Sequence, residues 1–412
     1  MTTDSDVLAA LLARKPGHSL PQPFYTDPHF FDCDLRNIWY KDWLLAIASA
    51  EVPKTGNYVT MQIGNAPVVI VRGADKKIRA FHNSCRHRGS RVCQQERGSS
   101  AKLTCPYHQW TYDLDGSLVW AREMQEGFDP KQYGLKPIHC EEASGIVFIC
   151  LADDAPDFKP LQEMAEKYAG PHDMPNLKVA ATRSIVENGN WKLVMENNRE
   201  CYHCAGSHPA LCRVFPDDPE LVGSFEGTSV AAANEHVERC EANGLPSKFY
   251  MEPGGQWRFV RIPFVGDAVS YTLEGTPAVS KRLGKIPFDN AGSLLFFHYP
   301  NTWNHLLSDT VTLFRMTPIS PTETQVMTTW LVNADAEEGV DYDVDRLTHV
   351  WIQTNAEDRE VVEENQKGIL SPAYQPGPYS AKQESGVIQF VDWYTDTLQQ
   401  RLTGRPRLMV AE

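Results

Sequence analysis

This 412-residue sequence lacks the cysteine content of a disulfide scaffold, since it has only ten cysteines. No stretch approaches the roughly 20 apolar residues of a membrane-spanning helix, so we expect no membrane span. Residues 1–15 contain acidic side chains and only a short Leu-Ala run, unlike the charged start and long apolar core of a secretory signal. These absences predict a globular protein of the cytoplasm.

Positive charge is also in short supply, with 39 Lys and Arg against 53 Asp and Glu and a formal charge of −14. Proteins that bind nucleic acid concentrate Lys and Arg, so we expect no nucleic-acid partner. The acidic balance is compatible with cationic small molecules, although net charge mainly reports solubility. The length exceeds that of one ordinary core, so two domains are expected.

Two short segments, Cys85-Arg86-His87 and Cys105-Pro106-Tyr107-His108, each pair one cysteine with one histidine. Seventeen residues separate His87 from Cys105. A [2Fe-2S] cluster with two thiolates on one iron and two imidazoles on the other needs two such loops. The pattern therefore predicts a one-electron carrier.

Two alternatives to a cluster remain open at this point. Two cysteines and two histidines also suit a structural zinc ion, although zinc fingers usually keep the two cysteines together and the two histidines together. The other alternative is a pair of unrelated surface segments. A cluster with thiolate ligands would favour a reducing compartment.

The chain predicts two different architectures. Residues 57–81, 110–119 and 146–151 contain short β-branched runs separated by turn residues, which predict a small antiparallel domain around the cluster loops. Residues 153–175, rich in Asp, Pro and Glu, resemble a connector. Beyond it, residues 293–316 and 325–333 read as long strands, while 344–368 has helical spacing and ends on a glycine suited to a C-cap. The second domain is expected to be α+β with an antiparallel sheet.

A second group of chemically active residues lies between 187 and 209. Asn190 can cap a helix whose positions i, i+4 and i+7 are Glu196, Glu200 and His203. His208 would lie about 140° around that helix from His203, so both can bind one metal only if the helix breaks. Gly206 and Pro209 could provide the break. The alternative is a surface helix with solvated acids and incidental histidines.

Two histidines need a carboxylate to complete the 2-His-1-carboxylate set of non-heme iron(II). The expected helix 344–368 offers five acids, which are Glu357, Asp358, Glu360, Glu363 and Glu364. Trp351, Asn355, Asp358 and Val362 follow the spacing of a buried face, and a buried carboxylate needs a partner. We therefore select Asp358 and expect the other acids to be solvated.

With these motifs in place, the chain resembles the alpha subunits of Rieske non-heme iron oxygenases from about residue 20 to residue 379. The resemblance implies an all-β Rieske [2Fe-2S] domain and a helix-grip type catalytic domain with an antiparallel sheet, in an α+β protein overall. It divides the chain into an N-terminal helical segment on the catalytic domain (1–44), the Rieske domain (45–160) and the catalytic non-heme iron domain (161–412).

The resemblance also implies roles for individual residues. Cys85 and Cys105 would bind one cluster iron, and His87 and His108 the other. The mononuclear iron(II) would be held by His203, His208 and Asp358. Glu200 occupies the place of a family acid, usually aspartate, that links the two centres across a subunit boundary. The electron path from His108 through Glu200 to a neighbour's His203 implies a head-to-tail homotrimer.

Within the family, residues 198–204 and 339–345 are most similar to enzymes that attack quaternary ammonium compounds. The implied reaction uses O2 and two electrons to hydroxylate an N-methyl group of proline betaine (stachydrine) or glycine betaine, and the hemiaminal then releases formaldehyde. The chain shows no convincing G-x-G-x-x-G of its own, so we expect a separate flavin and iron-sulfur reductase that draws electrons from NAD(P)H.

A betaine cation would be recognised by aromatic faces. The C-terminal half offers eight candidates, most of them expected to be core residues: Phe259, Phe264, Tyr271, Phe296, Phe297, Tyr299, Trp303 and Trp330. Two other functions remain open, an oxygenase that hydroxylates aromatic rings and a non-catalytic Rieske electron carrier.

Overall fold

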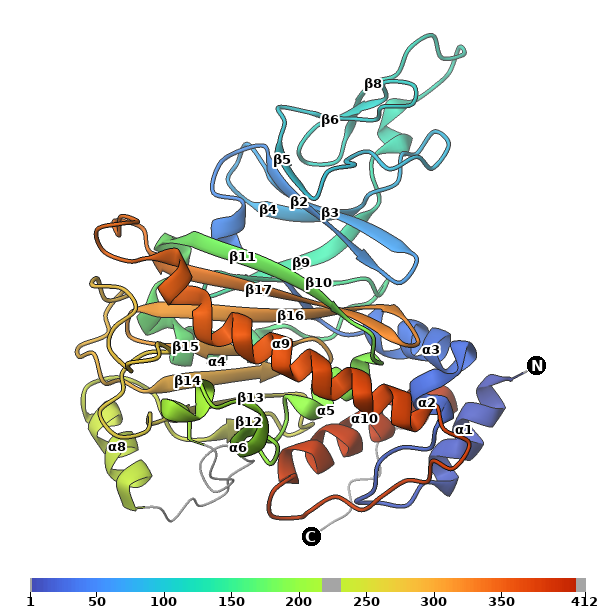
Figure 1. Ribbon diagram of the computed structural model, residues 1–412. Coiled ribbons are helices and arrows are strands. Elements are labelled where there is room, and N and C mark those ends of the chain that lie inside the picture. The colour runs from blue at the N-terminus through green and yellow to red at the C-terminus, as the bar shows by residue number, and fades with distance from the viewer. Residues whose placement is uncertain (1, 217–230, 405–412) are drawn as a thin grey trace.

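The computed structural model describes residues 2–216 and 231–404, and antiparallel sheets form its framework (Figure 1). One sheet of seven strands and a smaller sheet of three carry the cluster loops. A second sheet of seven strands, crossed by a long helix, makes up the other part. The predicted α+β class, with an all-β Rieske part and an antiparallel sheet in the other part, is confirmed.

The first seven-stranded sheet has the order β1-β10-β9-β4-β3-β2-β5. Its strands are β1 (Leu44–Ala48), β2 (Asn57–Ile63), β3 (Ala66–Arg72), β4 (Ile78–His82), β5 (Arg97–Ser99), β9 (Pro137–Ala143) and β10 (Ile146–Cys150). The hairpins predicted over 57–81 are present as β2, β3 and β4. The three-stranded sheet contains β6 (Leu103–Thr104), β7 (Thr111–Tyr112) and β8 (Leu118–Trp120).

A glycine fixes the turn between β7 and β8. Gly116 has a φ of +89°, and a Cβ atom there would lie 2.4 Å from Cε1 of Phe81. Glycine therefore suits this turn, which lies within the run 110–119.

The second seven-stranded sheet has the order β11-β17-β16-β15-β14-β13-β12. Its strands are β11 (Leu177–Glu187), β12 (Tyr250–Met251), β13 (Trp257–Ile262), β14 (Ser293–His298), β15 (Thr302–Leu306), β16 (Thr310–Ser320) and β17 (Glu323–Asn333). The apolar run 293–316 is thus divided among β14, β15 and most of β16. The strand predicted over 325–333 is β17.

Helices surround this framework, and the longest of them crosses the second sheet. They are α1 (Asp4–Ala13), α2 (Pro23–Thr26), α3 (Pro28–Asp34), α4 (Lys159–Ala169), α5 (Trp191–Asn197), α6 (Cys204–Ser207), α8 (Ala231–Ala242), α9 (Val344–Ile369) and α10 (Ser385–Thr403). Short helical turns are η1 (Leu35–Trp39), η2 (Ser49–Glu51), η3 (Pro130–Tyr133), η4 (Gly170–His172), η5 (Met174–Asn176) and η6 (Leu211–Arg213). The expected connector 153–175 therefore contains a regular helix, α4.

The long helix α9 begins at its N-cap Asp343, whose side chain accepts a hydrogen bond from the Arg346 amide. Its predicted buried face is confirmed, because Trp351, Asn355, Asp358 and Val362 are all buried. The predicted C-cap at Gly368 is wrong. The helix continues to Ile369 and its C-cap is Leu370, so Gly368 lies inside the last turn.

The N-terminal helices pack against α5 and α10 through a buried polar cluster. The Asp34 carboxylate pairs with Lys192, and neither side chain has appreciable exposure. Asp34 also accepts hydrogen bonds from the Tyr394 hydroxyl at 2.6 Å and the Trp191 indole at 3.0 Å. The division of the chain at residues 44 and 160 stays a prediction.

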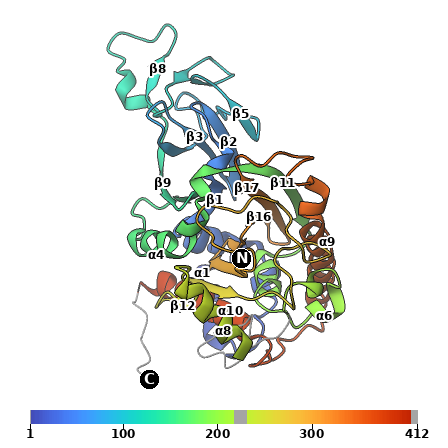
Figure 2. The same cartoon turned by 90° about the vertical axis from the view of Figure 1, so that its left-hand side faces the viewer.

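Figures 1 and 2 place the cluster loops, near β6 and β8, at one end of the molecule. In both views the segment around α6 lies far from these loops, beyond β11 and β17. No helix among residues 2–216 and 231–404 is long and apolar enough to cross a membrane.

Candidate metal centres and substrate cavity

The first cluster loop folds back on itself through two backbone hydrogen bonds. The Cys85 amide donates to the Ser90 carbonyl oxygen at 2.8 Å, and the Gly89 amide donates to the Cys85 carbonyl oxygen at 2.9 Å. Gly89 has a φ of +83°, in the region that favours glycine.

The second cluster loop repeats this geometry twenty residues later. The Cys105 amide donates to the Trp110 carbonyl oxygen at 2.8 Å, and the Gln109 amide donates to the Cys105 carbonyl oxygen at 3.0 Å. Gln109, like Gly89, has a positive φ, of 64°. The two loops therefore share the same backbone turn after the cysteine, although the histidine follows two residues after Cys85 and three residues after Cys105.

The four predicted cluster ligands meet between these loops. Nδ1 of His87 lies 3.1 Å from Nδ1 of His108. Burial raises the pKa of the Cys85 thiol; the Tyr112 hydroxyl opposes this rise, while the neighbouring Cys105 thiol adds to it. Both cysteines are buried, whereas His87 is exposed and His108 half-buried. The imidazole side would thus face outward, where an electron can leave.

Two aromatic residues brace this centre, and sequence reasoning did not identify them. The Tyr112 hydroxyl lies 3.2 Å from Sγ of Cys85 and accepts a hydrogen bond from the Arg86 amide at 2.9 Å. The Trp110 ring stacks on the His87 ring with 4.9 Å between centroids. Both contacts restrict the orientation of a ligand.

The second pair of histidines is brought together by a break in the helix. Asn190 caps α5 as predicted, because its side chain accepts from the Lys192 amide. The predicted helical face through Glu196, Glu200 and His203 is wrong, because α5 ends at Asn197. The break comes before His203 rather than at Gly206 and Pro209. His203 and His208 instead flank the single turn α6 as its N-cap and C-cap.

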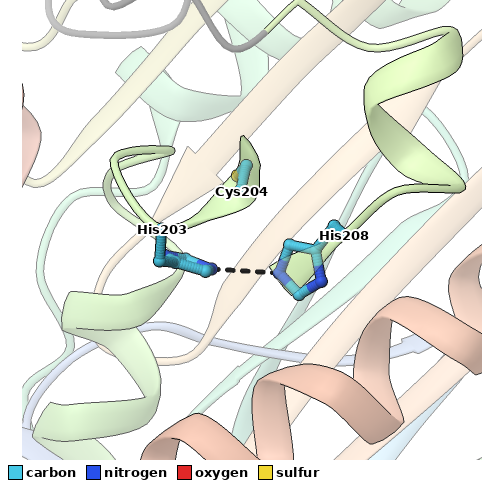
Figure 3. A group of neighbouring side chains, drawn as sticks. All are labelled: His203, Cys204 and His208. Carbon is cyan, nitrogen blue, oxygen red and sulfur yellow. Dashed lines mark hydrogen bonds between the residues drawn. The ribbon is translucent and has the colours of Figure 1, made fainter. Parts of the chain in front are cut away.

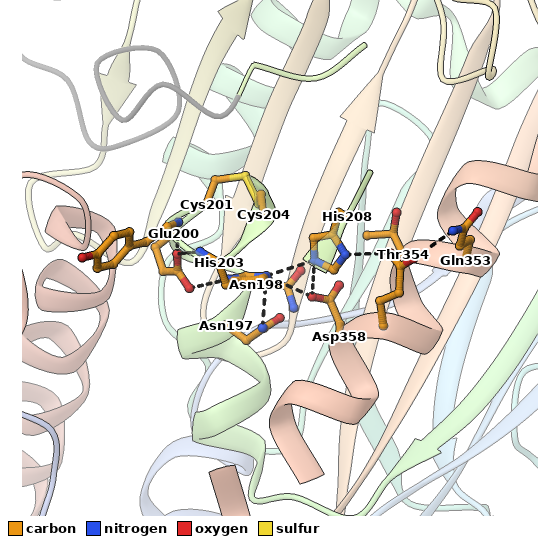
Figure 4. Close-up of polar contacts among 12 residues, drawn as sticks. Asn197, Asn198, Glu200, Cys201, His203, Cys204, His208, Gln353, Thr354 and Asp358 are labelled. Atoms are coloured by element: carbon orange, nitrogen blue, oxygen red, sulfur yellow. Dashed lines mark hydrogen bonds and ion pairs between the residues drawn. A yellow bond between two sulfur atoms is a disulfide. The ribbon is translucent and has the colours of Figure 1, made fainter. Parts of the chain in front are cut away.

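Three ligand atoms converge at this bend (Figure 4), and Figure 3 shows the two histidines among them. Nε2 of His203 lies 3.0 Å from Nε2 of His208, and Oδ1 of Asp358 lies 3.3 Å and 2.9 Å from these two nitrogens. Two imidazoles and a carboxylate on one side are the donor set that binds non-heme iron(II) with open positions. The residues therefore fit that ion.

Cys204 also lies within ligand distance of the two histidines. Its sulfur, however, forms a disulfide with Cys201, so it offers no thiolate. Sequence reasoning missed this bond, although the C-x2-C spacing was the available signal.

The charges of the three residues depend on one another. Burial disfavours the imidazolium of His203, but hydrogen bonds to Asp358 and Glu200 outweigh burial and raise its pKa to about 10. The pKa of His208 is raised in the same way by Asp358 and Glu357 against burial. Burial raises the pKa of Asp358, but the two imidazoles lower it overall. The site thus favours positive charge beside a carboxylate.

Each histidine has an outer carboxylate. Oε1 of Glu200 accepts from Nδ1 of His203 at 2.6 Å, and Oε2 of Glu357 accepts from Nδ1 of His208 at 2.8 Å. Gln353 in turn donates to Oε1 of Glu357 at 2.8 Å. The prediction that Glu357 is merely solvated is therefore wrong. Among the other acids, Glu360 and Glu364 are exposed as predicted, whereas Glu363 accepts hydrogen bonds from Asn188.

A cavity opens beside the three converging residues, between α9 and the sheet. Its apolar wall contains Leu211, Phe215, Leu295, Phe297, Trp303 and Trp351. Of the eight aromatic candidates, only Phe297 and Trp303 line this cavity. Phe296 faces the other side of the sheet and packs on Phe148 and Phe259, as strand alternation requires. Sequence reasoning missed Phe215 as a wall residue and read Trp351 only as a buried residue.

Known protein families match both the cluster part and the catalytic part of the chain. Residues 42–138 match the Rieske [2Fe-2S] domain family, and residues 174–400 match the family "Ring hydroxylating alpha subunit (catalytic domain)". The glycine betaine monooxygenase oxygenase subunit of Chromohalobacter salexigens is 46% identical and covers 96% of this chain and 90% of its own length. The subunit of the same name from Pseudomonas aeruginosa strain PAO1 is 47% identical, with 95% and 92% coverage.

A solved structure shows the same fold. The quaternary ammonium Rieske monooxygenase CntA with L-carnitine superposes with a TM-score of 0.69 at 23% identity, over 94% of this chain and 98% of CntA. The Rieske match favours a [2Fe-2S] cluster over zinc at the first centre. The chain therefore belongs to the Rieske non-heme iron oxygenases, as an oxygenase alpha subunit with a cluster domain and a mononuclear iron domain.

Proposed function

We propose that this protein is a monooxygenase that removes an N-methyl group from glycine betaine. The observation that carries this proposal is the 46–47% identity to glycine betaine monooxygenase oxygenase subunits over nearly the whole chain. The aromatic wall of the cavity supports it, because a quaternary ammonium group cannot donate hydrogen bonds and is bound by aromatic faces. Proline betaine remains the second substrate to be tested.

In this proposal the metal ligands are those of the resemblance. Cys85 and Cys105 hold one cluster iron, and His87 and His108 hold the other. His203, His208 and Asp358 hold the mononuclear iron. The positions of both sets, each converging on one point, support these assignments.

We also propose that electrons pass between chains of a homotrimer. The cluster loops and the α6 segment lie far apart within one molecule (Figure 1), which favours delivery of the electron from a neighbouring subunit. A hollow lined by Glu200, His203, Tyr374 and Tyr379 opens beside the α6 segment and could receive the neighbour's cluster loop. Glu200 would then link the neighbour's His108 to His203.

The electrons would come from NAD(P)H through a separate flavin and iron-sulfur reductase. The relatives' designation as oxygenase subunits supports a second component. A cluster held by thiolates fits a reducing compartment, so we place the protein in the cytoplasm.

The reaction then balances as follows. Iron held by His203, His208 and Asp358 would supply the position at which O2 is reduced and one oxygen atom is transferred to the substrate. The trimethylammonium group, O2, two electrons and two protons give an N-hydroxymethyl group and water. This hemiaminal releases formaldehyde, dimethylglycine and one proton. The cavity wall contributes by excluding water and by holding one methyl group toward the convergence of His203, His208 and Asp358.

The direct test is turnover of the purified protein with a chemical reductant, O2 and a panel of betaines. We expect one formaldehyde per dimethylglycine formed from glycine betaine. The His203→Ala variant should lose turnover while its cluster absorption stays unchanged. A phenol or cis-diol from an aromatic substrate, without formaldehyde from any betaine, would favour ring hydroxylation. Absence of O2 uptake with every substrate would favour a pure electron carrier.

A further inference from the structure

We propose that His305 forms the carboxylate-binding end of the substrate cavity, so that the enzyme selects betaines over cations without a carboxylate. This inference rests on the proposed function and names the group that distinguishes its substrate. A betaine carries a carboxylate as well as a cation, and the carboxylate needs hydrogen-bond donors. No lysine or arginine lines the cavity among the residues that the structure describes.

The strand register places His305 on the cavity wall. On β15, Trp303 and His305 are two residues apart and therefore face the same side of the sheet. They pair across to Phe297 and Leu295 of β14, which also line the cavity. The His305 ring lies 4.6 Å from the ring of Trp351 on α9, so helix and sheet close around it.

Two hydroxyl groups lie against one ring nitrogen of His305. The Tyr271 hydroxyl lies 2.8 Å from Nδ1 and the Ser293 hydroxyl 3.3 Å from the same atom. We assign the neutral tautomer in which Nδ1 accepts from the Tyr271 hydroxyl and Nε2 carries the proton. Within the described part of the chain, no residue hydrogen-bonds to Nε2. Because His305 lines the cavity, its Nε2–H is available to a ligand there.

The ring is also held neutral. It is buried, and burial lowers the pKa of His305 to about 3. Neutral imidazole is a donor that binds a carboxylate without placing a second cation beside the ammonium group. The Trp351 indole Nε1–H is buried and has no hydrogen-bond partner among the residues that the structure describes, so it is a second neutral donor near the same ring. A buried donor without a partner is costly, so a ligand oxygen that satisfies it would be stabilised.

The spacing along α9 agrees with the length of a betaine. Trp351 precedes Asp358 by seven residues, which is roughly 10 Å along a helix. The methyl carbon and the carboxylate oxygen of glycine betaine are four bonds apart, or about 5 Å. A methyl group held a few ångströms from the Asp358 end would therefore leave the carboxylate beside His305 and Trp351.

Two arginines lie nearby but do not reach the cavity. The guanidinium groups of Arg199 and Arg258 each lie 4.7 Å from the centroid of Phe297. Neither residue lines the cavity, and Arg199 donates to Tyr299. The ring of Phe297 separates them from the ligand, so they can add attraction at a distance but no hydrogen bond.

The test compares equilibrium binding of glycine betaine and tetramethylammonium to the oxidised holoenzyme by calorimetry, without reductant, so that no turnover occurs. We expect His305→Leu to lower the affinity for glycine betaine roughly 10- to 100-fold, the range for a hydrogen bond to a charged group. The affinity for tetramethylammonium should change by less than about threefold. His305→Gln keeps an N–H donor and should restore part of the loss. His298→Leu is the matched control, since His298 is a buried histidine of β14 outside the cavity.

Equal weakening of both ligands by His305→Leu, or unchanged betaine affinity, would overturn the proposal. If His305→Leu does not fold, Tyr271→Phe serves instead. It should lower the affinity for glycine betaine several-fold and leave the affinity for tetramethylammonium unchanged. Equal effects on both affinities would contradict the proposal. If the wild-type protein releases formaldehyde from glycine betaine but the variants do not behave as expected, only the carboxylate site is refuted. Wild-type protein that demethylates no betaine refutes the proposed function itself.

Discussion

The carboxylate of Glu357 offers a sharp test of the mononuclear site, because it is hydrogen-bonded to the proposed iron ligand His208. The sequence alone had predicted that this carboxylate is solvated. Glu357 accepts from Nδ1 of His208 at 2.8 Å and from Gln353 at 2.8 Å (Figure 4 shows the hydrogen-bonded group around His208). The first bond keeps the proton on Nδ1, so that Nε2 is free to bind iron. Glu357→Gln replaces this charged acceptor with a neutral amide, which accepts more weakly from the imidazole.

Substitutions of such outer partners typically cost 10- to 100-fold in metal affinity. The Glu357 side chain is 23% exposed, which weakens its electrostatic effect, so we expect a loss near the lower end, about tenfold. Anaerobic competition of the protein with a chelator for iron(II) measures the affinity. Visible absorption shows that the cluster remains intact.

Glu360→Gln is the matched control, because Glu360 is an exposed acid on the same helix and its loss removes the same charge. It should leave iron affinity within about twofold of the wild-type value. Equal iron affinities of the Glu357→Gln and Glu360→Gln variants would refute the role of the hydrogen bond to His208.

Three further predictions address the electron path, the stability of the fold and pH. Glu200→Gln weakens a charged hydrogen bond of 2.6 Å to His203, so oxidation of the reduced cluster by O2 with substrate present should slow roughly tenfold or more in stopped-flow absorption; an unchanged rate would exclude Glu200 from the path. Asp34→Ala leaves the fully buried Lys192 without its carboxylate, so the free energy of unfolding should fall by about 3–5 kcal/mol in denaturant titrations, and a loss below about 1 kcal/mol would contradict this. Burial lowers the pKa of His305 from 6.5 to about 3, so its ring stays neutral and glycine betaine affinity should be constant from about pH 6.5 to 8.5. The contribution of this neutral ring to the free energy of folding is lost as the pH falls from about 6.5 toward 3. A tenfold decrease in betaine affinity between pH 6.5 and 8.5 would instead indicate that an imidazolium binds the carboxylate.

The sequence predicted those parts of the sites that short segments encode. The cysteine and histidine spacings identified both cluster loops, because each loop supplies its ligands from within four residues. Asp358 was also predicted, since helical periodicity places it on a buried face of α9 that a charged group enters only with a partner.

The remainder depended on tertiary contacts that periodicity does not contain. The end of α5 at Asn197 moves Glu200 and His203 off the expected helical face. The contact of Glu357 with His208 joins residues 149 positions apart. Likewise, Phe297 and Trp303 become wall residues because β14 and β15 pair in a register that sets them opposite each other.

A single-turnover experiment tests the central claim most directly. Protein with a reduced cluster and iron(II) is mixed with O2 and glycine betaine in the absence of further reductant, and formaldehyde and cluster oxidation are followed together. We expect cluster oxidation to accompany formaldehyde, approaching one formaldehyde per mononuclear iron. Cluster oxidation without formaldehyde, or formaldehyde from protein that lacks the mononuclear iron, would contradict the account.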